Sequence, residues 1–215
     1  MATYVLVAGN LPTEVWNRLV GRNDYPPGGQ LGGQIWNYVV PALTAQGHSV
    51  FAPTLKNEQH HTLSDQIELV SQLLVENDIK NCILVGASYC GMVLTGVANK
   101  LANRIGLLVY LDAVLPEPGE SVADVFSRAH FIPHMPIENS PTFTEKLPYD
   151  PQKIHSIPKL YALCTQSSFA SVAALAKQKI TPAKDNWEYI ELPTSHLPMA
   201  THPDILNQLL LDLGR

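Results

Sequence analysis

Six short apolar runs, separated by segments with helical periodicity, constrain the fold of this chain more than any other feature. Most of these runs are continuous rather than alternating, which is the pattern of parallel strands that are buried on both faces of a sheet. Because strand-like and helix-like segments alternate along the chain, the sequence predicts a doubly wound, mostly parallel α/β sheet. The expected strands are residues 4–7, 49–52, 82–85, 107–111, 160–164 and 187–190.

Helical spacing of apolar residues is clearest in residues 64–76 and 201–213. Apolar side chains recur there every three or four positions, as expected when one helix face packs against a sheet. A capping-box spacing precedes each segment and predicts where each helix begins. The pairs are Thr62 with Asp65 and Thr201 with Asp204.

Two irregular segments interrupt the alternation. Residues 10–34 are rich in glycine and proline, and residues 115–158 contain prolines at a density that excludes one long helix. Long irregular insertions are more often binding loops than idle connections, although a surface elaboration is the alternative. We therefore expect a single domain over residues 1–215, with a lid-like loop at 10–34 and a cap insertion at 115–158.

Composition narrows the class of protein. Of 215 residues, 46% are hydrophobic and 15% are charged, with a formal net charge of −5, which gives no reason to expect nucleic acid or an anionic membrane as a partner. The three cysteines do not form a disulfide pattern, and no apolar run approaches the length of a membrane helix. We expect a cytoplasmic protein that acts on a small molecule; a homodimer is left open.

The motif Gly86-Ala87-Ser88-Tyr89-Cys90-Gly91 follows an expected strand and precedes an apolar helical stretch at 92–102. A nucleophile elbow requires this context, because a tight strand-to-helix turn exposes the serine and needs small residues on either side of it. Cys90 stands where glycine is usual. The motif favours Ser88 as a nucleophile over an ordinary glycine-rich turn.

His196 lies after the last expected strand and before the last helix. A serine hydroxyl needs a neighbouring base, and in α/β-hydrolases the order along the chain is serine, acid, histidine. His196 therefore fits the role of the base. The loop after the first strand and the residue after the serine supply the oxyanion-hole N–H groups in this fold, which points to Asn10 and Tyr89.

The chain resembles the hydroxynitrile lyase and plant methylesterase group of α/β-hydrolases, especially its small bacterial esterase-like members. The similarity covers most of the chain outside the two insertions and is densest in Thr62–Val122. It includes the segments Val109-Tyr110-Leu111-Asp112-Ala113 and His196-Leu197-Pro198-Met199. The resemblance implies a Ser-His-Asp triad that acts on small esters without a cofactor. The lyases of the group usually carry a threonine and a lysine at the positions where this chain has Gly9 and Leu197. This difference favours an esterase over a lyase.

The most consequential departure from this group concerns the catalytic acid. The group carries an aspartate after the strand that matches 160–164, where this chain has Ser167. Three outcomes follow for the group that orients the imidazole. Asp112 takes over as the acid, which we favour narrowly; or Ser88 and His196 act as a dyad with Ser167 as a weak orienter; or catalysis is lost and the pocket only binds.

The sequence thus predicts a serine hydrolase that cleaves a small, fairly apolar ester through an acyl-enzyme on Ser88. Two alternatives remain open: a ligand-binding protein on a hydrolase fold, and a lyase or cyclase that uses His196 as a base. No metal site is expected, because Pro133 breaks the helix that would align His130 with His134.

Overall fold

The computed structural model describes residues 1–133, 137–180 and 186–215. Within these residues, six strands form one sheet in the order β2-β1-β3-β4-β5-β6, and every neighbouring pair is parallel. The predicted sheet is therefore confirmed, and each expected apolar run forms a strand. The strands are β1 (Thr3–Val7), β2 (Ser49–Phe51), β3 (Cys82–Ala87), β4 (Ile105–Leu111), β5 (Lys159–Cys164) and β6 (Trp187–Leu192).

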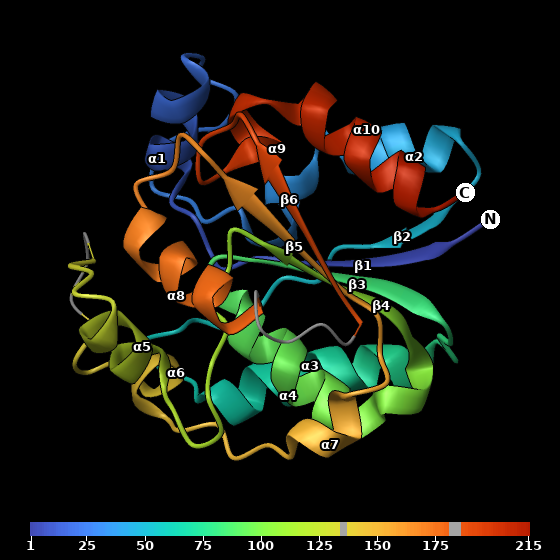
Figure 1. The fold of residues 1–215 in the computed structure, drawn as a ribbon. Helices are drawn as coiled ribbons and strands as arrows, with labels where there is room; N and C mark the ends of the chain where they lie inside the picture. The colour runs from blue at the N-terminus through green and yellow to red at the C-terminus, as the bar shows by residue number, and fades with distance from the viewer. Residues whose placement is uncertain (134–136, 181–185) are drawn as a thin grey trace.

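Helices cover both faces of the sheet (Figure 1). Successive residues of β1 point to opposite faces, since Val5 and Val7 belong to one buried apolar cluster and Tyr4 and Leu6 to the other. Burial on both faces explains why the strands are continuous apolar runs. The first cluster includes residues of α3 (Leu63–Glu76), α4 (Cys90–Leu101), α7 (Pro151–Ile154) and α8 (Ala170–Ile180); the second includes residues of α1 (Thr13–Val20), α2 (Val40–Ala45), α9 (Pro198–Thr201) and α10 (Pro203–Leu213).

One of the two predicted capping boxes forms. Thr62 accepts the Asp65 N–H and the Asp65 side chain accepts the Thr62 N–H, so α3 begins as expected. The box predicted at Thr201 and Asp204 is wrong: α10 begins only at Pro203, and no side chain caps it. The ring of a proline disfavours the helical conformation of the residue before it, and His202 accordingly has φ −141° and ψ 54°. The predicted single helix is therefore divided into α9 and α10.

The segment 10–34 contains α1 and an antiparallel bridge between Pro12 and Gln30, and it leads into the 3-10 helix η1 (Gly32–Trp36). Trp16 of α1 is fully buried in the second apolar cluster. A second 3-10 helix, η2 (Ala102–Arg104), precedes β4.

The segment 115–158 contains three short helices: α5 (Val122–Arg128), α6 (Pro141–Thr144) and α7. Figure 1 places α5 and α6, together with α8, at the end of the sheet where the strands finish. Parallel α/β sheets bind their ligands at this carboxyl end. No helix in the described part of the chain is long and apolar enough to cross a membrane.

Candidate active site

Ser88 lies in the tight turn between β3, which ends at Ala87, and α4, which begins at Cys90. Its φ of +59° is in the left-handed region, which residues other than glycine seldom adopt. Gly86 permits the turn, because a Cβ there would lie 2.3 Å from a Leu94 methyl carbon and 3.0 Å from the Cys90 carbonyl oxygen. The strand–turn–helix predicted around Ser88 is thus present, and the backbone is strained at Ser88 itself.

The turn at Ser88 is hydrogen-bonded to the end of β4 and to the turn that follows it. The Ser88 N–H donates to the Leu111 carbonyl (3.4 Å), and the Val114 N–H donates to the Ser88 carbonyl (2.9 Å). Gly91 allows the close approach, because a Cβ there would lie 1.9 Å from the Val114 carbonyl oxygen. Residues 111 and 114 flank Asp112, so the turns that carry Ser88 and Asp112 are held together through their backbones.

Asp112 and His196 are joined directly. His196 Nδ1 lies 2.7 Å from Asp112 Oδ2, and the carboxylate is fully buried while the His196 side chain is 22% exposed. The other carboxylate oxygen, Oδ1, accepts the Cys164 N–H at 3.2 Å. A carboxylate bonded to Nδ1 fixes the orientation and tautomer of an imidazole and leaves Nε2 free to act as a base. Of the three arrangements left open by the sequence, the geometry favours Asp112 as the acid.

Ser167 supports the carboxylate rather than the imidazole. Its hydroxyl donates to Asp112 Oδ2 (2.5 Å) and accepts the Phe169 N–H (2.9 Å). The side chain at the usual acid position of the related group therefore contacts the same carboxylate oxygen as His196. Asp112, at the end of β4, and Ser167, after β5, come together because β4 and β5 are neighbours in the sheet.

The Ser88 backbone and His196 are both connected to the turn that carries Asp112. His196 bonds the Asp112 carboxylate, and the Ser88 backbone bonds the residues on both sides of Asp112. Among the hydrogen bonds of the described residues, none joins the hydroxyl to the ring. Catalytic hydrogen bonds are often long or poorly aligned in unliganded enzymes and tighten when substrate binds.

The two residues expected to supply oxyanion donors both contact Glu58, which the sequence analysis missed. Glu58 Oε1 accepts the Asn10 backbone N–H (2.9 Å) and the Tyr89 hydroxyl (3.0 Å). Gly9 makes room for this arrangement, because a Cβ there would lie 2.5 Å from the Tyr89 ring. Burial raises the pKa of Tyr89 well above its usual value, so the phenol stays protonated and donates. Glu58 belongs to a polar loop without periodicity or motif, so no local signal identified it.

Comparisons with known proteins give partial sequence matches. No family model matches the chain. The carbendazim hydrolyzing esterase of Nocardioides sp. (strain SG-4G) is 37% identical over 106 residues, which is 46% of this chain and 44% of that protein. The polyneuridine aldehyde esterase of Rauvolfia serpentina is 29% identical over 111 residues, 47% of this chain and 42% of that protein. The chain thus spans less than half the length of these curated relatives.

The structural matches extend over the whole chain. An extracellular alpha/beta-hydrolase from a Paenibacillus species, described as sharing structural and functional homology with tobacco salicylic acid binding protein 2, superposes with a TM-score of 0.74 at 20% identity and covers 100% of both chains. The chain has the α/β-hydrolase fold. A structure of polyneuridine aldehyde esterase gives a TM-score of 0.73 at 18% identity, again over 100% of both chains. The resemblance to the methylesterase and hydroxynitrile lyase group is confirmed.

An aromatic cluster borders the imidazole. The Phe169 ring lies 4.6 Å from the His196 ring between centroids, and Phe131 lies 5.0 Å from Phe169. Phe126 of α5 contacts both phenylalanines, at 4.9 Å and 5.7 Å. Since Phe126 and Phe131 belong to the cap insertion, the cap contributes an apolar wall beside His196.

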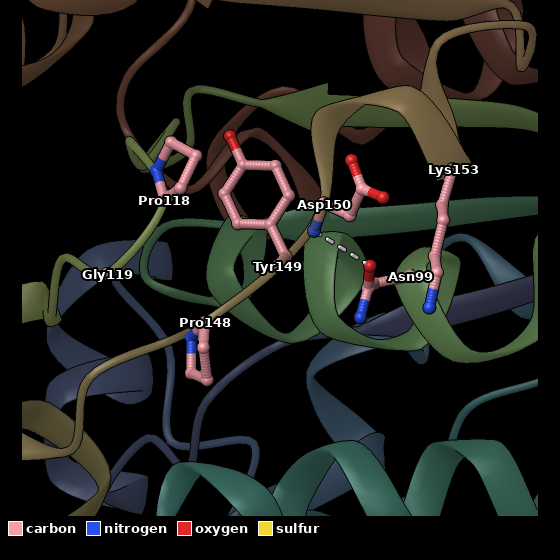
Figure 2. A pocket seen from close by; sticks show the side chains of 7 residues that line it. All are labelled: Asn99, Pro118, Gly119, Pro148, Tyr149, Asp150 and Lys153. Atoms are coloured by element: carbon pink, nitrogen blue, oxygen red, sulfur yellow. Dashed lines mark hydrogen bonds between the residues drawn. The ribbon is translucent and has the colours of Figure 1, made fainter.

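A groove of about 500 Å³ lies away from these residues, between the end of α4 and the cap (Figure 2). The Asp150 N–H donates to Asn99 Oδ1 (3.0 Å) at its rim. None of the residues lining the groove is a predicted site residue: they are Asn99, Pro118, Gly119, Pro148, Tyr149, Asp150 and Lys153.

The described residues contain no cluster of three metal-ligating side chains. His134, which the sequence suggested as a partner of His130, lies outside the described residues.

Proposed function

We propose that this chain is a serine hydrolase that cleaves a small, fairly apolar carboxylic ester. The observation that carries the proposal is the 2.7 Å hydrogen bond between His196 Nδ1 and the fully buried Asp112 carboxylate, next to the strained turn of Ser88. That arrangement supports His196 as the base and Asp112 as the acid of a triad, with Ser88 as the nucleophile. The partial matches to two named esterases support the same reaction class.

In the proposed mechanism, His196 Nε2 removes the Ser88 hydroxyl proton as Oγ attacks the ester carbonyl carbon. Asp112 stabilises the imidazolium that forms, and the tetrahedral intermediate collapses when His196 protonates the departing alcohol. Water, deprotonated by His196, then attacks the acyl-enzyme, and the acid leaves as Ser88 regains its proton. Backbone N–H groups of Asn10 and Tyr89 are the proposed donors to the oxyanion.

The aromatic cluster supports an apolar substrate. Phe126, Phe131 and Phe169 form a wall beside His196, and burying an apolar group against such rings removes it from water. A small apolar ester would place its apolar portion there while its carbonyl reaches Ser88.

Labelling with a fluorophosphonate probe tests the proposal, because such probes phosphonylate only an activated serine. We expect the wild-type protein to be labelled. The variants Ser88→Ala and His196→Ala should lose labelling but keep the thermal unfolding midpoint of the wild type. Ser127→Ala, in the exposed part of α5, is the matched control and should be labelled like the wild type. Equal labelling of the wild type and Ser88→Ala would contradict the proposal. Absence of labelling, together with stabilisation by esters that are never turned over, would instead indicate a binding protein.

A further inference from the structure

Glu58 occupies a position that the proposed mechanism does not use. One of its carboxylate oxygens, Oε1, accepts both the Asn10 N–H and the Tyr89 hydroxyl. The described residues donate no hydrogen bond to the second oxygen, Oε2, and none of their lysines, arginines or histidines forms an ion pair with the carboxylate. A half-buried carboxylate thus lies at the oxyanion loop with one oxygen still able to accept a hydrogen bond.

The backbone at Glu58 is fixed to the cap. The buried Ser140 hydroxyl donates to the Glu58 carbonyl (2.6 Å), and Thr142 Oγ1 donates to the His61 carbonyl (2.7 Å). Both serine and threonine lie at the start of α6. The backbone of this segment is thus anchored on the cap side, whereas the Glu58 carboxylate is held by its hydrogen bonds to Asn10 and Tyr89.

We propose that Glu58 is a specificity-determining residue, which holds the Asn10 N–H in the resting state and favours esters that carry an ammonium or N–H donor beside the scissile carbonyl. The inference rests on the proposed function and names the substrate class of that same site.

The physical reason is competition for one hydrogen. A backbone N–H carries a single proton, and while the Glu58 carboxylate accepts it, the carbonyl oxygen of a substrate cannot. A plain ester must displace the carboxylate and then develop an oxyanion near it, at a cost in rate. A substrate with a cationic or N–H donor offers the carboxylate a new partner, which draws it away from Asn10 and frees the oxyanion donor.

Two probe esters of the same shape test the proposal. Methyl phenylalaninate carries an ammonium beside the carbonyl when protonated, and methyl 3-phenylpropanoate lacks it. We expect the wild type to prefer the amino ester by about tenfold in kcat/KM, because loss of an oxyanion donor costs about a hundredfold or more and the carboxylate withholds that donor only in part.

Glu58→Ala should abolish the preference and raise kcat/KM for the plain ester by about tenfold. Glu58→Gln keeps the shape without the charge and should also lose the preference for the ammonium. Glu76→Ala, at an exposed position on α3, is the control and should retain the wild-type ratio. Because the readout is a ratio of two substrates on one protein sample, partial unfolding of a variant does not change it.

The possible failures are distinct. If both esters are hydrolysed and Ser88 is labelled, but Glu58→Ala keeps the wild-type ratio, the role of Glu58 is overturned and the hydrolase proposal stands. If neither ester is hydrolysed and Ser88 is not labelled in any variant, both proposals are overturned.

Discussion

At the scale of single residues, the carboxylate that contacts His196 belongs to Asp112. Asp112 follows β4, whereas the related group places its acid after the strand corresponding to β5, where this chain has Ser167. Both side chains reach the same point, since His196 Nδ1 and Ser167 Oγ lie 2.7 Å and 2.5 Å from Asp112 Oδ2. The contacting carboxylate thus has two partners, the His196 imidazole and the neutral Ser167 hydroxyl.

Substitutions at these two positions should have unequal effects. Asp112→Asn removes the charge that stabilises the imidazolium and should lower kcat by about 10⁴-fold. Ser167→Ala removes one of three hydrogen bonds to the carboxylate and should lower kcat by about tenfold. Steady-state hydrolysis of one ester by both variants provides the measurement. Similar losses in the two variants would contradict the greater role assigned to Asp112.

The sequence predicted Ser88 and His196 as site residues from their motif and chain order, but it could not choose between Asp112 and Ser167 as the partner of the imidazole. That choice depends on the pairing of β4 with β5, where Leu111 lies opposite Ala162 and the Asp112 N–H donates to the Ala162 carbonyl (2.8 Å). Register across a parallel sheet is not encoded in local spacing. Glu58 was missed for the same reason, because only the folded chain brings it to Asn10.

At the scale of elements, the start of α4 packs so closely against the turn after β4 that a Cβ at Gly91 would overlap the Val114 carbonyl oxygen. Gly91 lies in the first turn of α4, and its neighbour across the gap is backbone, the Val114 carbonyl, rather than a flexible side chain. Backbone cannot yield as a side-chain end does, so any substituent at residue 91 must move the helix or the turn.

Gly91→Ala should therefore lower the free energy of unfolding by about 3 kcal/mol, the upper part of the usual range for overpacking. Gly28→Ala is the matched control: no heavy atom lies within 4 Å of the place that a Cβ would take there, and only the left-handed backbone at φ +83° opposes the substitution. Gly28→Ala should lower the free energy of unfolding by about 1 kcal/mol. Urea unfolding of both variants measures the difference, and equal costs would show that the helix start accommodates a methyl group.

Strands and long helices were predictable because their signals are local. All six apolar runs formed strands, and the periodicity of 64–76 gave α3 together with its capping box. The capping-box spacing predicted one helix over 201–213, but Pro203 separates this segment into α9 and α10. The short helices of the cap were not predictable, since a proline-rich segment with no repeating apolar pattern depends on tertiary contacts for its shape.

At the scale of the whole molecule, one lysine is buried at the beginning of β5. Lys159 is 5% exposed, and its ammonium donates to the carbonyls of His155 (3.2 Å) and Ile157 (2.7 Å). Removal from water lowers its pKa from 10.5 to about 8. Below about pH 8 the folded protein buries a charge that the unfolded chain exposes to water. Burying this charge lowers the free energy of unfolding.

Lys159→Met should therefore be more stable than the wild type below pH 8, and the difference should narrow as pH rises towards 10.5. Between these values the unfolded wild-type chain binds a proton that the folded protein does not, so wild-type stability gains up to about 3 kcal/mol relative to the variant. Burial raises the pKa of Cys82 to about 11 and of Cys164 to about 12, which destabilises both proteins equally at high pH. Denaturant unfolding at several pH values provides the comparison; a constant difference would contradict the prediction.

The hydrogen bonds from Ser88 to Leu111 and from Val114 to Ser88 join two loops that are distant in the chain. The turns that carry Ser88 and Asp112 are consequently held together as one unit, whereas His196 comes from a segment near the far end of the sequence. Insertions or deletions within residues 112–114 would shift Ser88 even if Asp112 and His196 were kept. Redesign of substrate range in this scaffold is therefore safest in the cap and in the loop that bears Glu58, both of which lie outside that unit.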